Sequence, residues 1–407
     1  MESKRLIAGL ELGSNQFTLS VGEVLDRGRW ILKAADSVAA QGLERGILSD
    51  PVECADALVR LMRKVEAALS IRLSKVLVAF PGSTLKSTNA SASVPIPDPS
   101  GGISRRDVER VMSNCRTLCL DYNRQILHAF VRGFTVDGQS GVKDPVGLYG
   151  TKLSVDLHLV TALTAGVQNL VRVLSRAGLE VEEFLLPGLA SAEAVLSDLD
   201  RDLGVTLISI GEFQTEALLW TDGQVRETFL VPSGIDHLVE GLARQFKLPR
   251  AAAEGLFEQT RTVEENPQTA QVPLRVRAGS LSRSFPQEQV SRQVGSRIKE
   301  TLNRVRHRLD ESPYFRESAS GVVMVGSLAR LEGFLEMAEE LLNMPVRLGT
   351  LREVEREPGL AVGSAHTATI GLIRRGVNRT LSAAGNGGGT LWHRWVEKTR
   401  QLLEEYF

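Results

Sequence analysis

Two glycine-containing turns, far apart in the chain, combine residue types that hold phosphate and magnesium. The first follows the apolar run at 5–10 and supplies Glu11, Gly13, Ser14, Asn15 and Gln16. The second follows the apolar run at 205–210 and extends from Gly211 to Thr215. Backbone N–H groups at such turns can approach phosphates, and a nearby carboxylate can hold Mg²⁺ through water. If the two turns face each other across a cleft, they predict a phosphate-binding site.

The second turn is poorly suited to this chemistry. A phosphate loop needs small residues so that its backbone can approach the ligand. Phe213 would block that approach, and Glu212 would repel phosphate. A third turn, at Gly326 and Ser327, could contact a base and a ribose, but it contains a single glycine. The alternative interpretation is that all three turns are structural hairpins.

The segments around the first two turns have the pattern of paired β-strands. A buried strand is predicted at 5–10, with a returning strand at 17–24. Residues 205–210 and 215–220 repeat this arrangement, and 221–223 predicts a further hairpin. The repetition indicates two related lobes, each of which opens with a hairpin.

Helices should connect these strands, because apolar residues recur at helical spacing elsewhere. They are predicted over 51–70, 104–119, 167–177, 236–246, 290–310 and 331–343. Ser104 and Asp107 have the spacing of a capping box at the second of these helices. Residues 84–102, rich in Ser, Thr, Pro and Gly, should mark the entry to an insertion, and 259–287 should be rich in loops. The pattern predicts an α/β protein with two lobes and smaller inserted modules.

The composition favours a folded protein of more than one domain, since the chain has 407 residues and is 43% hydrophobic. A net charge of −1 gives no basic field for nucleic acid, which is therefore not an expected partner. Three cysteines (Cys54, Cys115 and Cys119) fit a reducing cytoplasm. Neither they nor the six histidines have metal-ligand spacing, so no metal site is expected. We expect no signal peptide and no membrane-spanning helix, so membrane association must come from the C-terminal end.

Residues 391–407 separate into an apolar half and a polar half when they are placed on a helix at about 100° per residue. The apolar half contains Leu391, Trp392, Trp395, Val396, Thr399, Leu402, Leu403, Tyr406 and Phe407. Tryptophan and tyrosine favour the headgroup layer, and the segment is too short and too charged to span a bilayer. We predict that it lies in the membrane surface. Its acidic and basic residues balance, so hydrophobic insertion rather than attraction to anionic lipid should drive the binding. The small, flexible residues before it should act as a tether. Docking in a protein groove is the alternative.

Basic residues are concentrated between Arg292 and Arg308, where Glu300 is the acid within the span. The set comprises Arg292, Arg297, Lys299, Arg304, Arg306 and Arg308, with His307 added when it is charged. Such a helix could bind an acidic segment of a partner through Arg297, Arg304 and Arg308. The alternative is a solvated helix face.

The sequence strongly resembles the FtsA family, the actin-like bacterial proteins that tie the FtsZ division ring to the membrane. The most specific stretch, 133–161 (GFTVDGQSGVKDPVGLYGTKLSVDLHLVT), is similar to the signature of the family's inserted subdomain 1C. Residues 169–196 and 344–349 are also similar to the family. The resemblance implies an α/β, actin-like two-lobed fold, as in actin and the heat-shock chaperone ATPases, with subdomain 1C in place of actin 1B.

The resemblance also implies subdomain boundaries. Subdomain 1A should comprise 1–83, 162–202 and 360–379, with 1C inserted at 84–161. Subdomain 2A should comprise 203–240 and 315–359, with 2B at 241–314. A flexible linker at 380–390 and the membrane helix at 391–407 complete the plan.

By resemblance, the nucleotide site should comprise Glu11, Gly13, Ser14, Asn15, Gln16, Gly211, Thr215, Gly234, Asp236, Glu254, Gly326 and Ser327. The chain departs from the family at both phosphate turns. The family's first turn begins with aspartate where this chain has Glu11. The second reads Asp-x-Gly-Gly-Gly-Thr-Thr, but here Ser209 replaces the magnesium carboxylate and Glu212 and Phe213 replace glycines. The family implies ATP and Mg²⁺ as cofactors, yet these changes would each cost several kcal/mol if uncompensated. We therefore expect a retained fold, no catalytic residues and no hydrolysis.

The resemblance implies a cell-division adaptor on the cytoplasmic face of the membrane at the division site. Its partners would be the FtsZ C-terminal tail, further copies of itself, lipid and other divisome proteins. One alternative is a nucleotide-gated ATPase that polymerises at the membrane, with Glu11 in place of aspartate on Mg²⁺. Another is an actin-like assembly-platform protein of the pilus type.

Overall fold

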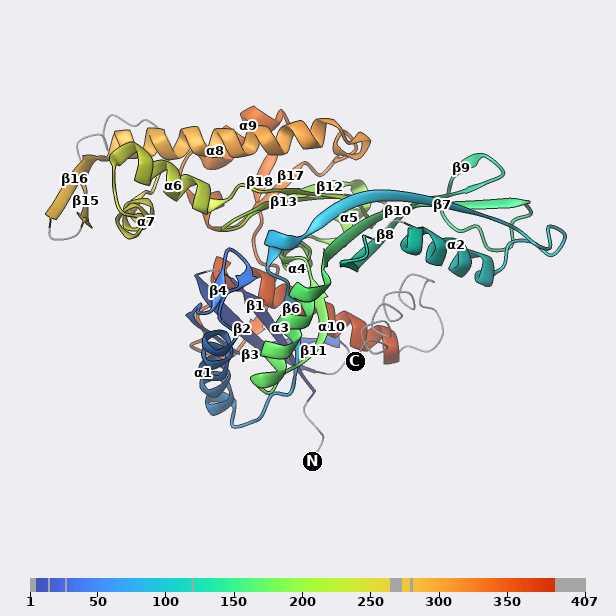
Figure 1. The fold of residues 1–407 in the computed structure, drawn as a ribbon, viewed down its shortest axis with the longest axis horizontal. Helices are drawn as coiled ribbons and strands as arrows, with labels where there is room; N and C mark the ends of the chain where they lie inside the picture. Colours follow the sequence, from blue (N-terminus) through green and yellow to red (C-terminus); the bar gives the residue numbers. More distant parts are fainter. Residues whose placement is uncertain are drawn as a thin grey trace.

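Two lobes and an inserted module, each with its own β-sheet, make up the molecule (Figure 1). The computed structural model describes residues 5–13, 15–25, 28–118, 121–263, 273–278 and 281–384. In Figure 1, lobe I lies below lobe II, and the inserted module extends to the right. One hydrophobic core fills lobe I and continues onto one face of the lobe II sheet, while lobe II and the module each have a further core.

Lobe I is built on a six-stranded sheet with the order β11-β6-β1-β2-β3-β19. Its strands are β1 (Leu6–Leu12), β2 (Gln16–Val24), β3 (Trp30–Ala39), β6 (Lys75–Ala79), β11 (Glu180–Leu185) and β19 (Glu355–Arg356). β1 runs antiparallel to β2 and parallel to β6. A small hairpin of β4 (Leu43–Glu44) and β5 (Ile47–Leu48) lies between β3 and the first helix.

The helices of lobe I are α1 (Pro51–Leu69), α3 (Thr164–Arg176), α4 (Pro187–Val195) and α10 (Thr367–Ala384), whereas the short α5 (Asp198–Leu203) leads into lobe II and packs against its sheet. Asp50 caps the N-terminus of α1, because its side chain accepts the N–H groups of Val52 and Glu53. α4 is buried along nearly its whole length, because it packs against α10 and the lobe II sheet. A Cβ on Gly371 of α10 would lie 1.7 Å from the carbonyl oxygen of Ala190, so only glycine permits this approach.

Lobe II repeats the opening hairpin in a five-stranded sheet with the order β14-β13-β12-β17-β18. Its strands are β12 (Val205–Ile210), β13 (Thr215–Thr221), β14 (Gln224–Val231), β17 (Val322–Val325) and β18 (Val346–Leu348). Its helices are α6 (Ile235–Phe246), α7 (Arg250–Gln259), α8 (Gln287–Asp310) and α9 (Phe334–Leu342), with short 3₁₀ turns η3 (Pro313–Phe315) and η4 (Ser327–Arg330). A two-stranded hairpin of β15 (Pro273–Ala278) and β16 (Leu281–Pro286) packs beside α7 and α8.

The inserted module is a four-stranded antiparallel sheet with the order β7-β10-β8-β9 and one covering helix. Its elements are β7 (Lys86–Pro95), α2 (Arg105–Leu118), β8 (Arg124–Val136), β9 (Gln139–Val142) and β10 (Lys152–Leu163). The predicted capping box is confirmed: Asp107 Oδ2 accepts the Ser104 N–H at 3.0 Å, and Ser104 Oγ accepts the Asp107 N–H at 3.3 Å.

Both predicted opening hairpins and the six helices predicted between residues 51 and 343 are present, with shifts at their ends. The loop prediction for 259–287 is wrong at 273–278 and 281–286, which form β15 and β16, and 84–102 contains β7. Helix α10 runs to Ala384, so the first residues of the predicted linker at 380–390 are helical rather than flexible. β19, predicted within subdomain 2A, pairs with β3 in the lobe I sheet instead. Within the described ranges, none of the helices combines the length and apolar character needed to cross a membrane.

Candidate functional site

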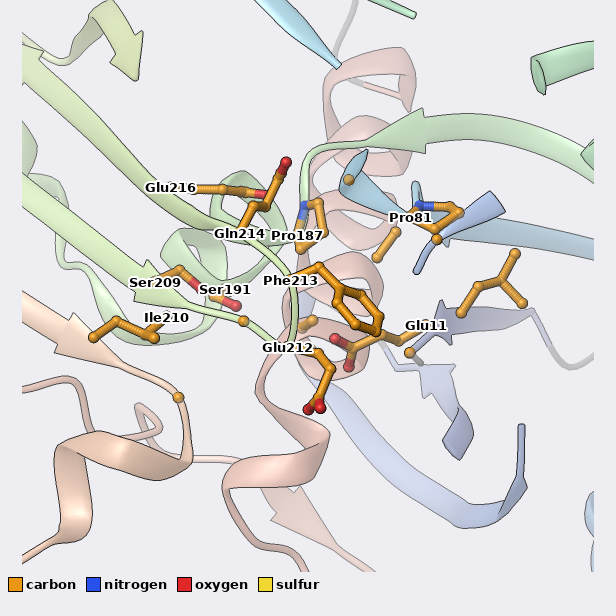
Figure 2. A pocket seen from close by; sticks show the side chains of 18 of the residues that line it. Glu11, Pro81, Pro187, Ser191, Ser209, Ile210, Glu212, Phe213, Gln214 and Glu216 are labelled. Atoms are coloured by element: carbon orange, nitrogen blue, oxygen red, sulfur yellow. The ribbon is translucent and has the colours of Figure 1, made fainter. Parts of the chain in front are cut away.

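A cavity of about 330 Å³ lies between the lobes, where the β1–β2 and β12–β13 turns face each other (Figure 2). The residues implied by the family resemblance that line it are Glu11, Gly13, Asn15, Gln16, Gly211, Gly326 and Ser327. Four others, Thr215, Gly234, Asp236 and Glu254, lie outside the lining, and Ser14 is not among the described residues. The two turns are thus brought together as the sequence predicts.

Thr215 and Gly234 hold the second turn in place. The Thr215 hydroxyl donates to the Ser233 carbonyl oxygen at 2.7 Å. A Cβ on Gly234 would lie 2.4 Å from the carbonyl oxygen of Gly211, so glycine is required where the start of α6 meets the turn. The first N–H groups of α6 donate to the turn, from Ile235 to Gly211 at 3.1 Å and from Asp236 to the next carbonyl at 2.8 Å. Because these N–H groups at the start of α6 already donate to protein carbonyls, fewer N–H groups are available to bind a phosphate.

Three consecutive residues of this turn, 212–214, reach across the cavity to lobe I, and we call them the bridging loop. Glu212 accepts a hydrogen bond from Asn15 Nδ2 at 3.4 Å. Phe213, whose ring Figure 2 shows extending towards the side that carries Glu11, also lines the cavity. The Gln214 amide lies against η2 (Gly82–Thr84). The approach is so close that a Cβ on Gly82 would be 2.1 Å from Gln214 Nε2. The chain itself therefore fills much of the space that small glycines would leave open.

Arg45, on the β4–β5 hairpin of lobe I, ties the mouth of the cavity to α6 of lobe II. Its guanidinium lies 3.1 Å from Asp236 and 2.8 Å from Glu240, and 5.9 Å from the centre of the Phe213 ring. Asp236 is also 2.5 Å from Arg250, which in turn binds Glu254 at 2.8 Å. Both acids that the resemblance places near the nucleotide are thus engaged with arginines of the protein.

The cavity wall is acidic. Burial, and then the charge of Glu216, raise the pKa of Glu11 to about 7. Burial also raises the pKa of Glu216, although its hydrogen bonds act in the opposite direction. The pKa of Glu212 is raised by burial and next by the charge of Asp236, against the opposing charge of Arg250. Charge is thus costly on this surface even without a ligand, and a polyphosphate would add to that cost.

Glu216 occupies the N-terminus of α4. It is 4% exposed, and its carboxylate accepts the Gly188 N–H at 2.7 Å and the Gln214 amide at 2.9 Å. A helix N-terminus is a natural site for a phosphate or another acidic group, and here a side chain of the protein occupies it. Glu216 was not among the predicted site residues. The sequence signal for it is an acidic residue within the apolar strand 215–220.

The residues present do not fit ATP with Mg²⁺. Ser209 stands where the family carries a magnesium carboxylate, and it lines the cavity together with Glu11 and Glu216. The bridging loop occupies the second phosphate turn and places the acidic side chain of Glu212 there. In the described part of the chain there is no group of three His, Cys, Asp or Glu side chains that could hold a metal ion.

The basic residues of α8 are paired along the helix. Arg297 and Arg304 both bind Glu300, at 3.0 and 2.6 Å, and Arg308 binds Glu311 at 3.4 Å. The guanidinium of Arg308 also lies 5.4 Å from the centre of the Phe229 ring. The sequence interpretation considered only the acid inside the span and missed the pairing acids at its ends, which are Glu288, Asp310 and Glu311. An acidic partner would therefore have to compete with these short-range pairs.

The remaining predicted site residues are those of the apolar helix half in 391–407, which lies outside the described residues. Arg45 and Arg250 were not predicted. Arg45 lies between Gly42 and Gly46 in a tight hairpin and has a left-handed backbone with φ of 50°. An arginine held in that conformation is a signal for a special position, but it is visible only in the structure.

Comparison with protein families gives two matches along the chain. The family described as "SHS2 domain inserted in FTSA" matches residues 82–161, and the family described as "Cell division protein FtsA" matches residues 206–365. The first match coincides with the inserted module, and the second covers most of lobe II. Together they extend over more than half of the chain.

Curated relatives agree. The cell division protein FtsA of Pseudomonas aeruginosa is 27% identical over 384 residues, which are 93% of this chain and 91% of the relative. The cell division protein FtsA of Escherichia coli (strain K12) is 25% identical over an alignment of 422 positions, which covers 99% of this chain and 99% of the relative. The similarity thus includes nearly the whole length of these proteins.

Solved structures establish the fold. The PilM–PilN type IV pilus biogenesis complex has a TM-score of 0.64 at 17% identity and covers 92% of this chain and 99% of the other. MreB5 of Spiroplasma citri bound to ADP has a TM-score of 0.55 at 11% identity and covers 94% of this chain and 99% of the other. The predicted α/β, actin-like two-lobed fold with an inserted module is confirmed.

Proposed function

The chain belongs to the FtsA family of cell-division proteins, and from this premise we propose that it anchors FtsZ filaments to the cytoplasmic membrane without hydrolysing ATP. The observation that carries the proposal is the bridged cleft. The bridging loop and Arg45 make contacts between the lobes with side chains of the protein itself. A protein that acts by recruiting partners needs a stable body, and these contacts stabilise the body without a nucleotide.

The membrane attachment is assigned to the helix at 391–407. Helix α10 ends at Ala384 on the side of lobe I that lies below the inserted module in Figure 1, and its Leu381 packs against Gly28. The residues that follow are rich in glycine and lead to the amphipathic segment. This arrangement supports a tether that leaves from lobe I and places that lobe nearest the membrane.

Self-association makes this attachment effective. A single short amphipathic helix binds lipid reversibly, but several helices on one assembly bind far more tightly, because the later binding steps are intramolecular. We therefore propose that the actin-like body forms filaments or dimers, and that other divisome proteins join this scaffold. A membrane adaptor that did not self-associate would be released easily.

The acidic partner segment is assigned to lobe II, where α8 carries Arg297, Arg304 and Arg308. We propose that the FtsZ C-terminal tail binds there by exchanging carboxylates with Glu300 and Glu311. Exposed ion pairs are weak, typically about 0–1 kcal/mol, so such an exchange costs little. The contact should be sensitive to salt for the same reason.

A nucleotide-gated ATPase remains the second candidate, and one observation favours it. Glu11 keeps a carboxylate beside the first turn, and it lines the cavity. If it holds Mg²⁺, the protein should bind ATP in a calorimetric titration and retain nucleotide after gentle purification. The adaptor proposal expects neither result.

Vesicle co-sedimentation of the full chain and of a variant that lacks 391–407 tests the proposal. The full chain should sediment with lipid vesicles, and the shortened chain should stay in solution. Substituting Trp392 and Trp395 with alanine should reproduce the deletion, whereas substituting Arg400 and Gln401 on the polar half serves as the matched control. Unchanged sedimentation of the shortened chain would reject the membrane helix.

A further inference from the structure

The inserted module is joined to the chain through lobe I, yet one face of its sheet is bonded to lobe II. β7 begins just after η2, and β10 leads directly into α3, so both covalent connections are to lobe I. Side chains of the same sheet form hydrogen bonds with Glu227 and Thr228 of β14. The module therefore contacts both lobes, and it does so through residues other than those of the bridging loop.

His158 on β10 is at the centre of this contact and is 3% exposed. Its Nε2 accepts the backbone N–H of Thr228 at 2.9 Å and lies 2.7 Å from the Thr228 hydroxyl. Because Nε2 accepts a hydrogen bond, the proton is on Nδ1, which donates to Asn89 Oδ1 at 2.6 Å. Burial, and then the charge of Arg132, lower the pKa of His158 to about 3. The ring is neutral and fixed in one tautomer.

Glu227 on β14 is the buried acid of the contact and is 5% exposed. Its carboxylate accepts a hydrogen bond from Asn89 Nδ2 at 3.1 Å, lies 3.1 Å from the Arg132 guanidinium, and accepts the hydroxyl of Ser312. Arg132 in turn lies 5.3 Å from the centre of the Tyr314 ring. Two residues of the module and one of lobe II thus satisfy one buried carboxylate.

A row of stacked rings continues from His158 back to lobe I. The ring of Phe130 on β8 is 6.4 Å from that of His158 and 5.7 Å from that of His128, at angles of 20° and 21°. His128 Nε2 accepts the N–H of Leu186, the residue before α4, at 3.1 Å. In the first turn of α4, the Gly188 N–H holds the cleft carboxylate described above. The row therefore ends at an element that forms part of the cavity wall.

We propose that the inserted module is a mechanical coupler between the lobes, so that a partner bound to the module changes the closure of the cleft, and the cleft changes the position of the module. A buried polar group that loses its hydrogen-bond partner carries the full cost of its desolvation. The contact with lobe II should therefore hold or break as a unit rather than slide. If the lobes move relative to each other, the contact at Glu227 or the one at Leu186 must give way. This role is additional to membrane anchoring and does not depend on the helix at 391–407.

Hydrogen exchange on the full chain tests the coupling from both ends. Glu227→Gln weakens the lobe II end, and we expect amide exchange in 186–190 of lobe I to become at least about threefold faster. His128→Phe keeps the stacked ring but removes the acceptor of the Leu186 N–H, and exchange in β14 should rise by a similar factor. Asp156→Asn, on the exposed outer part of β10, is the matched control and should change neither segment.

Confinement of the faster exchange to the mutated end in both variants would overturn the proposal, because each contact would then be only local packing. Circular dichroism and the unfolding transition verify that the variants are folded. If Glu227→Gln does not fold, Thr228→Val removes one hydroxyl from the same contact at nearly constant volume. Its effect on 186–190 is then the deciding measurement, and an unchanged exchange rate there would also refute the coupling.

Discussion

The pH dependence of stability should reveal the state of Glu11, because its carboxyl shares the cavity with Glu216. Burial and that neighbouring charge raise the pKa of Glu11 from 4.5 to about 7. The folded state therefore binds this proton more tightly than the unfolded state does. The stabilising contribution is complete below the unfolded pKa and is lost as the pH rises through about 7.

The size of the effect follows from the pKa difference. Each pKa unit corresponds to about 1.4 kcal/mol, so this difference is worth at most about 3.5 kcal/mol in the free energy of unfolding. Glu11 is only partly buried by its neighbours and lines an open cavity, so screening reduces the expected effect to about 1–2 kcal/mol. Glutamine has the same shape and remains uncharged. Glu11→Gln should equal the parent protein near about pH 4 and exceed its stability by this amount near about pH 8.

Urea unfolding across this pH range measures the difference. Burial lowers the pKa values of His128 and His158 to about 3, so their contribution is lost as the pH falls below 6.5, in the opposite direction to that of Glu11. Both proteins share this effect, so the comparison isolates Glu11. Glu340→Gln, an exposed position on α9, is the control and should show no pH-dependent difference. If Glu11→Gln were the less stable protein at high pH, the ionised carboxylate would have a favourable partner such as a bound cation, and the reasoning would be wrong.

Three further predictions follow from the contacts described above. Arg45→Ala removes ion pairs between the lobes and should cost about 0.5–1 kcal/mol in urea unfolding at low salt, and less at high salt. It should also speed amide exchange in the bridging loop, whereas Arg244→Ala, which removes a pair within α6, should not. Trp395→Ala should lower vesicle affinity by about tenfold or more in a sedimentation titration, because a large apolar surface is lost from the membrane-facing half; equal affinity would contradict a surface-bound helix. Reversing the charge of Arg304 and Arg308 to glutamate should weaken binding of the FtsZ tail several-fold in fluorescence anisotropy, and an unchanged affinity would exclude α8 as the contact.

Local patterns allowed the prediction of the elements that frame the cavity. Apolar runs that end in glycine turns define β1–β2 and β12–β13, and these signals need only neighbouring residues. The β15–β16 hairpin was missed because prolines suggested a loop, yet Pro273 and Pro286 lie opposite each other at its end. Proline is tolerated at such strand ends, where no ladder hydrogen bond is needed from it. β7 was missed because its small polar residues resemble a linker.

The contacts across the cavity could not be predicted in the same way. Whether Phe213 points into the cavity depends on the register of one hairpin, and a shift of one residue would reverse it. The partners of Arg45 on α6 are distant in sequence, so only the folded structure brings them together. In contrast, the pairing of Arg304 with Glu300 follows helical spacing and was available from the sequence. Family resemblance supplied the fold and the cell-division role, and the membrane helix stays a prediction.

Recruitment of FtsZ filaments to lipid vesicles by the full-length chain, measured with and without ATP and Mg²⁺, tests the account most directly. We expect equal recruitment under both conditions, because the lobes are already bridged by the chain's own side chains. Recruitment that requires ATP, or that increases strongly when it is added, would contradict an adaptor that works without nucleotide.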